Sequence, residues 1–111
     1  MEMQHIRYFL ALCEEQNFTR AARRCGVAQP SLTRAIKRLE KELGGELFER
    51  SRKNSEMTAL GRAMRPHFAE IARAAAAARR EAARLAAARP ATKGFRPPER
   101  AARKAVEAAP A

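Results

Sequence analysis

Hydrophobic side chains between residues 3 and 43 recur with the 3.6-residue period of amphipathic helices, in three successive groups. The groups predict helices over residues 3–15, 18–25 and 29–43. Each helix is expected to bury one apolar or small-residue face in a shared core. These faces consist of Ile6, Phe9, Leu10 and Cys13 in the first helix, Ala21, Ala22 and Cys25 in the second, and Leu32, Ile36, Leu39 and Leu43 in the third.

Residues with particular backbone preferences mark the ends of these helices. Asn17 can cap the second helix, because its side chain can accept a hydrogen bond from a free N–H of the first turn. Gly26 stands where the chain needs a positive φ to leave that helix, and Pro30 suits the first turn of the next. Gly44 and Gly45 end the third helix. A short helix, a glycine turn and a helix that starts with polar residues are typical of a helix-turn-helix.

Two short strands are expected next, over residues 46–50 and 55–58, around a basic turn. A two-stranded hairpin is not stable alone. We therefore expect Leu47, Phe48 and Met57 to fasten it to the helical core while its tip reaches outward. The predicted fold class is mainly α, a winged helix-turn-helix in which this hairpin is the wing.

A long helix is expected after the wing, capped by Thr58 and ending near Ala88. Its apolar residues follow an unbroken heptad spacing of four and three, which predicts a seam between two copies of the helix. An alanine-rich segment matches many patterns by chance, but every bulky apolar residue after the first seam position falls on the seam. The seam consists of Met64, Phe68, Ile71, Ala75, Ala78, Ala82 and Leu85.

The pattern divides the chain into a winged helix-turn-helix over 1–60, a linker or dimerisation helix over 58–88, and a basic disordered tail over 89–111. The net charge is +11, from 23 Lys and Arg against 12 Asp and Glu. Residues 61–111 hold 12 of these basic side chains and only 4 of the acidic ones. This excess indicates a polyanionic partner, which charge alone leaves open between nucleic acid and an anionic membrane surface.

Other function classes find little support in the sequence. Cys13 and Cys25 lack metal-ligand spacing, His5 and His67 are not placed to complete a site, and both cysteines suit buried positions in a reducing compartment. No nucleophile–base pair or phosphate loop is present, so we expect neither an enzyme nor a cofactor. The sequence shows no signal peptide or membrane-spanning run. We expect a cytoplasmic protein without a membrane partner.

The polar face of residues 29–43 carries the chemistry of DNA recognition. Gln29 can pair bidentately with adenine, and Arg34 with guanine O6 and N7. Ser31 and Thr33 can contact bases or phosphates. Basic side chains elsewhere on the two helices can neutralise phosphates, which sets register and salt dependence rather than sequence preference. These phosphate contacts are expected from Arg20, Arg23, Lys37, Arg38 and Lys41.

Several motifs resemble the N-terminal domain of LysR-type transcriptional regulators. They are IRYF at 6–9, NFTRAA at 17–22, AQPSLTRAIKRLEKELG at 28–44, LFER at 47–50 and TALG at 58–61. The resemblance covers about residues 1–88. It implies promoter DNA as partner, dimers joined through the linker helix that commonly form tetramers, and contact with RNA polymerase. The DNA-contacting positions that it implies are Gln29, Pro30, Ser31, Thr33 and Arg34 in the recognition helix and Arg50, Arg52 and Lys53 in the wing.

The resemblance stops before the effector-binding domain that members of this family carry. Two alternatives therefore stay open beside a sequence-specific regulator. The chain could act as a truncated interaction module that forms mixed oligomers with full-length relatives. Its basic second half could instead bind RNA or coat DNA without sequence preference.

Overall fold

The computed structural model describes residues 1–50 and 55–88. It divides into two compact units, Met1–Ala72 and Arg73–Ala111, and each is treated by itself. The predicted wing tip at 51–54 and the predicted tail at 89–111 lie outside the described residues. The elements are α1 (Met3–Glu15), α2 (Phe18–Cys25), α3 (Gln29–Leu43), β1 (Phe48–Arg50), β2 (Ser55–Met57) and α4 (Ala59–Ala88). The predicted fold class, mainly helical with one small antiparallel sheet, is confirmed.

Local signals set the helix ends as the sequence predicts. The Asn17 side chain caps α2, with Oδ1 accepting a hydrogen bond from the Arg20 backbone N–H at 2.9 Å. Gly26 follows α2 with φ of 70°, and Gly44 follows α3 with φ of 80°. Both glycines adopt the left-handed conformation that side chains with a Cβ adopt at a cost. The three predicted helix ranges of the first 43 residues are confirmed.

Replacing Asn17 by alanine should destabilise the domain by about 1 kcal/mol, because the Arg20 N–H then loses its side-chain acceptor. Urea unfolding followed by circular dichroism measures this change. Asn17→Asp keeps an acceptor oxygen and should restore most of the stability. An alanine variant as stable as the wild type would show that the cap contributes nothing.

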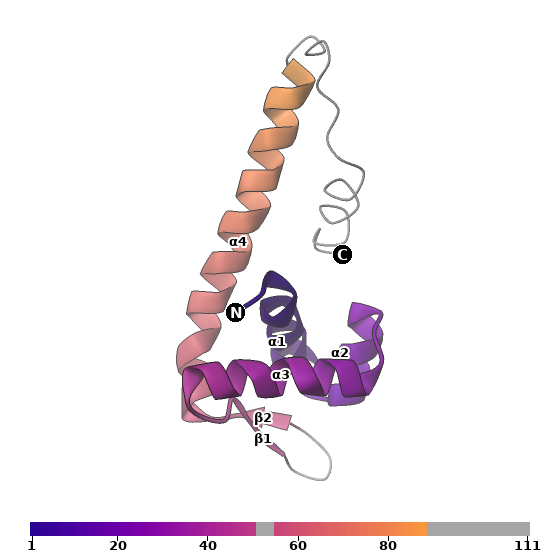
Figure 1. Ribbon diagram of the computed structural model, residues 1–111, viewed down its shortest axis with the longest axis vertical. Coiled ribbons are helices and arrows are strands. Elements are labelled where there is room, and N and C mark those ends of the chain that lie inside the picture. Colours follow the sequence, from indigo (N-terminus) through magenta and orange to yellow (C-terminus); the bar gives the residue numbers. More distant parts are fainter. Residues whose placement is uncertain (51–54, 89–111) are drawn as a thin grey trace. The chain divides into compact units, whose positions relative to one another are not determined.

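The core of the first unit surrounds α1, which is flanked by α2 and crossed by α3 (Figure 1). The predicted stripe on α1 is only partly right. Leu12 is fully buried although it was not expected to be, whereas Leu10 is only half-buried. Because α2, α3 and β2 all contact α1 from different sides, burial is not confined to one face. On α3, Ala35 is buried although the predicted stripe does not include it. Leu43, which belongs to the predicted stripe, is partly buried against the core.

Aromatic rings join elements that lie far apart in the sequence. The Phe9 ring lies 5.4 Å from Phe48 and 5.0 Å from Phe68, centroid to centroid, the latter edge-on at 90°. Phe68 belongs to α4 and is only 2% exposed. The first turns of α4 therefore complete this core, and the compact unit extends past the domain boundary predicted at residue 60.

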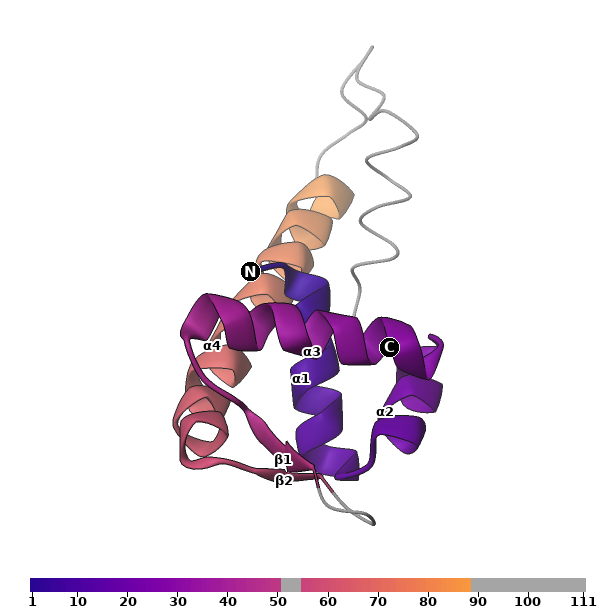
Figure 2. The same ribbon diagram turned by 60° about the horizontal axis from the view of Figure 1, so that its bottom comes forward.

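The hairpin of β1 and β2 follows α3 and precedes α4 (Figure 2). Side chains and backbone groups both hold it at its base. β1 and β2 pair antiparallel in the register Phe48 with Met57, and are shorter than the predicted strands. Leu47 is completely buried just before β1, and its N–H donates to Glu40 Oε2 at 2.7 Å. Its carbonyl accepts from the Thr58 N–H at 3.0 Å. The predicted anchoring role of Leu47, Phe48 and Met57 is confirmed.

The second unit is described over 73–88, the remainder of α4. Its large apolar residue, Leu85, is 52% exposed. Glu81 and Arg84 form an ion pair at 3.6 Å on its surface. Within residues 1–50 and 55–88, no helix combines the length and the apolar character needed to cross a bilayer.

Candidate nucleic-acid interface

In the α2–turn–α3 unit, one side of α3 packs on the core and the other side is a polar surface. Leu32, Ile36 and Leu39 are fully buried, which fixes the rotation of α3 about its own axis. The opposite side of the helix therefore faces solvent. Its exposed predicted contact residues are Gln29, Pro30, Arg34, Lys37 and Arg38, and Ser31 and Thr33 are half-buried beside them.

The charge on this surface is almost entirely positive, because the carboxylates of α3 are held by other groups. Glu42 pairs with the N-terminal amine of Met1 at 3.0 Å, and Glu40 accepts the Leu47 N–H. Among the described residues, neither Lys37 nor Arg38 has an ion-pair partner. Their charges are thus available to an external anion.

Two hydrogen bonds order the polar side chains near the start of α3. The Thr19 hydroxyl of α2 donates to Gln29 Oε1 at 3.0 Å, which links the two helices across the turn. One turn further along α3, an Arg34 guanidinium nitrogen donates to Ser31 Oγ at 3.5 Å. The predicted base-contacting residues Gln29 and Arg34 each have one intramolecular partner and remain exposed.

The basic residues of α2 differ in how far they are neutralised within the chain. Arg20 donates to the Glu15 carbonyl at 2.8 Å and lies 3.6 Å from that residue's carboxylate. Arg24 pairs with Glu14 at 2.5 Å and with Glu15 at 3.3 Å. The hydrogen bond with Glu14 is the main reason that the pKa of Arg24 is raised. Arg23 is exposed. A phosphate contact by Arg20 therefore competes with Glu15, which the sequence did not predict.

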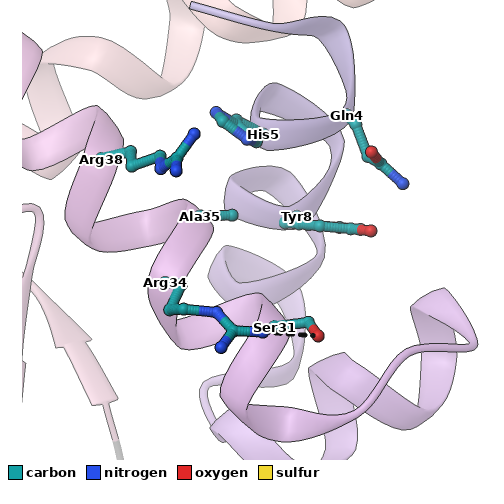
Figure 3. A pocket seen from close by; sticks show the side chains of 7 residues that line it. All are labelled: Gln4, His5, Tyr8, Ser31, Arg34, Ala35 and Arg38. Carbon is teal, nitrogen blue, oxygen red and sulfur yellow. Dashed lines mark hydrogen bonds between the residues drawn. The ribbon is translucent and has the colours of Figure 1, made fainter.

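A pocket of about 220 Å³ lies between α1 and α3, beside the exposed surface of α3 (Figure 3). Arg38 on α3 and His5 on α1 point toward one another across it. The lining residues are Gln4, His5, Tyr8, Ser31, Arg34, Ala35 and Arg38, none of which is acidic. Burial raises the pKa of the Tyr8 phenol. The contribution of α1 to this pocket was not predicted from the sequence.

The wing cannot be compared residue by residue with its prediction. Arg52 and Lys53 lie outside the described residues, as does the side chain of Arg50. The hairpin base that carries them is described, and it is attached to the core through Leu47 and Phe48. The wing contacts therefore stay a prediction.

The cysteines occupy positions of low reactivity. Cys13 is 3% exposed, and burial raises the pKa of its thiol to about 11. Its sulfur lies 3.5 Å from the Met57 sulfur. Cys25 is half-buried, and burial also raises its pKa. Within the described part of the chain, no three His, Cys, Asp or Glu side chains are grouped to hold a metal ion.

The residues of the predicted dimerisation seam differ in their burial. Phe68 is buried against Phe9 of its own chain, and Met64 packs partly on the same core. Phe68 is thus not on the surface that a second copy could contact, which corrects its assignment to the seam. The remaining large seam residues, Ile71 and Leu85, are 38% and 52% exposed. Between them Ala75 is half-buried, and Ala78 and Ala82 are exposed.

The fold and the exposed basic face of α3 define a winged helix-turn-helix domain. Residues 3–62, more than half of the chain, match the family described as bacterial regulatory helix-turn-helix proteins, lysR family. The chain belongs to this family, so the resemblance noted in the sequence is confirmed.

Relatives and solved structures agree with this assignment. The transcriptional regulator ShiR from Corynebacterium glutamicum is 47% identical over 79 residues, which are 71% of this chain and 27% of ShiR. The chain thus spans about a quarter of that relative. The BenM DNA-binding domain in complex with catB site 1 DNA superposes with a TM-score of 0.74 at 37% identity, over 78% of this chain and 97% of that one. The CbnR DNA-binding domain in a DNA complex gives 0.70 at 39%, over 80% and 100%.

Proposed function

We propose that the chain binds double-stranded promoter DNA sequence-specifically and regulates transcription. The observation that carries this proposal is the surface of α3, where Gln29 and Arg34 stand exposed among unneutralised basic side chains on a helix fixed by its buried face. The superposition on the BenM domain, which was solved with DNA, supports the proposal.

In the proposed complex, α3 enters the major groove. Gln29 contacts an adenine edge and Arg34 a guanine edge, while Ser31, Thr33 and Pro30 complete the contact with bases or backbone. Lys37, Arg38 and Arg23 neutralise phosphates. Arg20 also contacts a phosphate when its ion pair with Glu15 is broken. The wing residues Arg50, Arg52 and Lys53 would add contacts in the minor groove. The phosphate contacts supply affinity that falls with salt, and the base contacts supply specificity.

Selection of bound duplexes from a random DNA pool tests the proposal. The selection is run at about 0.15 M salt, since lower salt exaggerates non-specific binding. We expect the selected duplexes to share a common motif and to bind at least about 10³-fold more tightly than random duplex of the same length. Equal affinity for selected and random duplexes would overturn sequence-specific binding and favour a non-specific nucleic-acid binder.

We further propose that two copies associate through α4, which would place two recognition helices on an interrupted inverted repeat. Exposure of the apolar side chains of Ile71 and Leu85 at heptad positions supports this. With Phe68 in the core and Met64 packed partly against it, the proposed seam consists of Ile71, Ala75, Ala78, Ala82 and Leu85. Tetramers and contact with RNA polymerase or with full-length relatives stay predictions from the family.

Replacing Ala78 by glutamate is expected to weaken this dimer at least about tenfold, because two like charges would meet at the seam without partners. Sedimentation equilibrium over a range of protein concentrations measures the dissociation constant. Ala77→Glu is the matched control, since it places the same charge on the same helix one residue off the seam. An oligomer that responds equally to both substitutions, or to neither, would contradict the seam.

A further inference from the structure

We propose that Thr19 is a positioning residue for base recognition, because its hydroxyl fixes the amide of Gln29 in the orientation that pairs with adenine. The contact behind this inference is the 3.0 Å hydrogen bond from Thr19 Oγ1 to Gln29 Oε1. The two residues belong to different helices and are ten positions apart. The inference rests on the proposed role of Gln29 in reading a base.

Thr19 is well suited to hold another side chain because its own backbone is fixed. It occupies the second position of α2, directly after the residues that anchor the start of this helix. Asn17 caps the helix, and the Phe18 ring lies 6.4 Å from the Phe48 ring, centroid to centroid. Ala21, two residues further along α2, is completely buried. The hydroxyl thus projects from a helix end that is tied to the core on both sides.

Gln29 benefits from such support because it stands at the exposed start of α3. It is the first residue of α3, and its side chain is exposed. Freezing a free glutamine side chain on DNA costs rotamer entropy. A hydrogen bond made before DNA arrives removes part of this cost from the binding step, which is the general benefit of preorganisation.

The geometry of the hydrogen bond is compatible with adenine recognition. A carboxamide oxygen has two lone pairs, so Gln29 Oε1 can accept from Thr19 and from the adenine N6 amino group together. The Nε2 group keeps both hydrogens, one of which can donate to adenine N7. The hydrogen bond holds the Gln29 side chain in one position, with the oxygen directed toward Thr19. A freely rotating side chain would sample other positions and discriminate less between bases.

The test compares three single variants and one double variant on duplexes selected by the unmodified protein from a random pool. Thr19→Val keeps the shape and the β-branch but removes the hydroxyl, and Thr19→Ser keeps the hydroxyl. Gln29→Ala identifies the base pair that Gln29 reads, as the position whose preference it flattens. Affinities are then measured for the selected duplex, for duplexes altered at that base pair, and for random duplex, each at several salt concentrations. Thermal unfolding checks that every variant is folded.

We expect Thr19→Val to reduce discrimination at the Gln29 base pair roughly three- to tenfold, as loss of one supporting hydrogen bond predicts. Binding to random duplex and its salt dependence should be unchanged, and Thr19→Ser should keep most of the discrimination. In the Gln29→Ala background, Thr19→Val should have no further effect on that base pair. A purely structural role would instead lower binding to all duplexes and would not depend on Gln29.

Three outcomes overturn the inference. If Thr19→Val weakens binding to selected and random duplexes equally, Thr19 contacts a phosphate or supports the fold. If Gln29→Ala flattens one position but Thr19→Val does not, Gln29 reads a base without help, and the proposed function stands. If Gln29→Ala flattens no position, both the positioning role and the assignment of Gln29 in the proposed function fail.

Discussion

The double substitution Gln29→Ala with Arg34→Ala is expected to remove most of the base preference of the domain while leaving its fold intact. A good bidentate contact discriminates against the wrong base by about 1–3 kcal/mol, so loss of two contacts should cost about 2–6 kcal/mol of discrimination. That range corresponds to a loss of specificity on the order of 10¹- to 10⁴-fold. Both side chains are exposed and neither belongs to the core, so stability should change little.

The measurement is a selection from a random pool with the double variant, followed by competition between the wild-type motif and random duplex. Lys37→Ala provides the contrast, because Lys37 is exposed and without an ion-pair partner in the described part of the chain. As a phosphate contact, Lys37 should contribute affinity to all duplexes equally, and its loss should reduce the salt slope by about one. A double variant that still selects the wild-type motif would remove α3 from the role of recognition helix.

The helix boundaries could be predicted because their signals are local. Asn17, Gly26 and Gly44 act on backbone groups within four residues of themselves, and the structure gives them the cap and the positive φ values that this requires. The wing was located for a similar reason, since the apolar Leu47, Phe48 and Met57 bracket a polar turn. The second strand ends before Thr58, whose hydroxyl instead caps α4 by accepting a hydrogen bond from the Gly61 N–H at 3.0 Å.

The sequence could not predict whether an apolar stripe packs on its own chain or on a second copy. Heptad spacing places Phe68 and Ile71 on the same seam, yet Phe68 packs on Phe9 in its own chain whereas Ile71 is 38% exposed. The periodicity of a sequence shows which residues share a helix face. Which other residues pack on that face depends on the three-dimensional arrangement of the elements. For the same reason Leu12 was missed, because α1 is enclosed from more than one side.

The support of the candidate site was equally hidden from the sequence. The residues expected to touch DNA follow from side-chain chemistry on one helix, and the structure places Gln29 and Arg34 on the exposed face as predicted. The residues that form hydrogen bonds or ion pairs with the predicted contact residues lie partly on other elements. Their partners could be identified only from interatomic distances in the structure. Thr19 contacts Gln29 only because the glycine turn brings two helix ends together, and Glu15 reaches Arg20 across the gap between α1 and α2.

Replacing Gly61 by alanine is expected to destabilise the first unit by about 3 kcal/mol, despite the better helix propensity of alanine. A Cβ at residue 61 would meet the Leu47 carbonyl oxygen at 2.2 Å and Met57 Cβ at 3.3 Å. The clash is with backbone, so no side-chain rotation relieves it. Leu47 cannot move easily either, since its side chain is fully buried and its N–H is held by Glu40. Overpacking of this kind costs about 1–3 kcal/mol and occasionally more.

The sign of the change in unfolding free energy distinguishes the effect of the close contact at residue 61 from the effect of helix propensity. In a helix with open space, Gly→Ala stabilises by roughly 0.5–1 kcal/mol, so propensity alone predicts a more stable protein. Urea unfolding at several protein concentrations measures the change and separates it from any effect on association. Gly26→Ala is the matched control, because it has φ of 70° and nothing within 4 Å of the added Cβ. It should cost about 1 kcal/mol through backbone strain alone. A Gly61→Ala variant as stable as the wild type would mean that α4 does not approach the base of the wing as closely as the structure places it, and the attachment of the wing to the core would need another explanation.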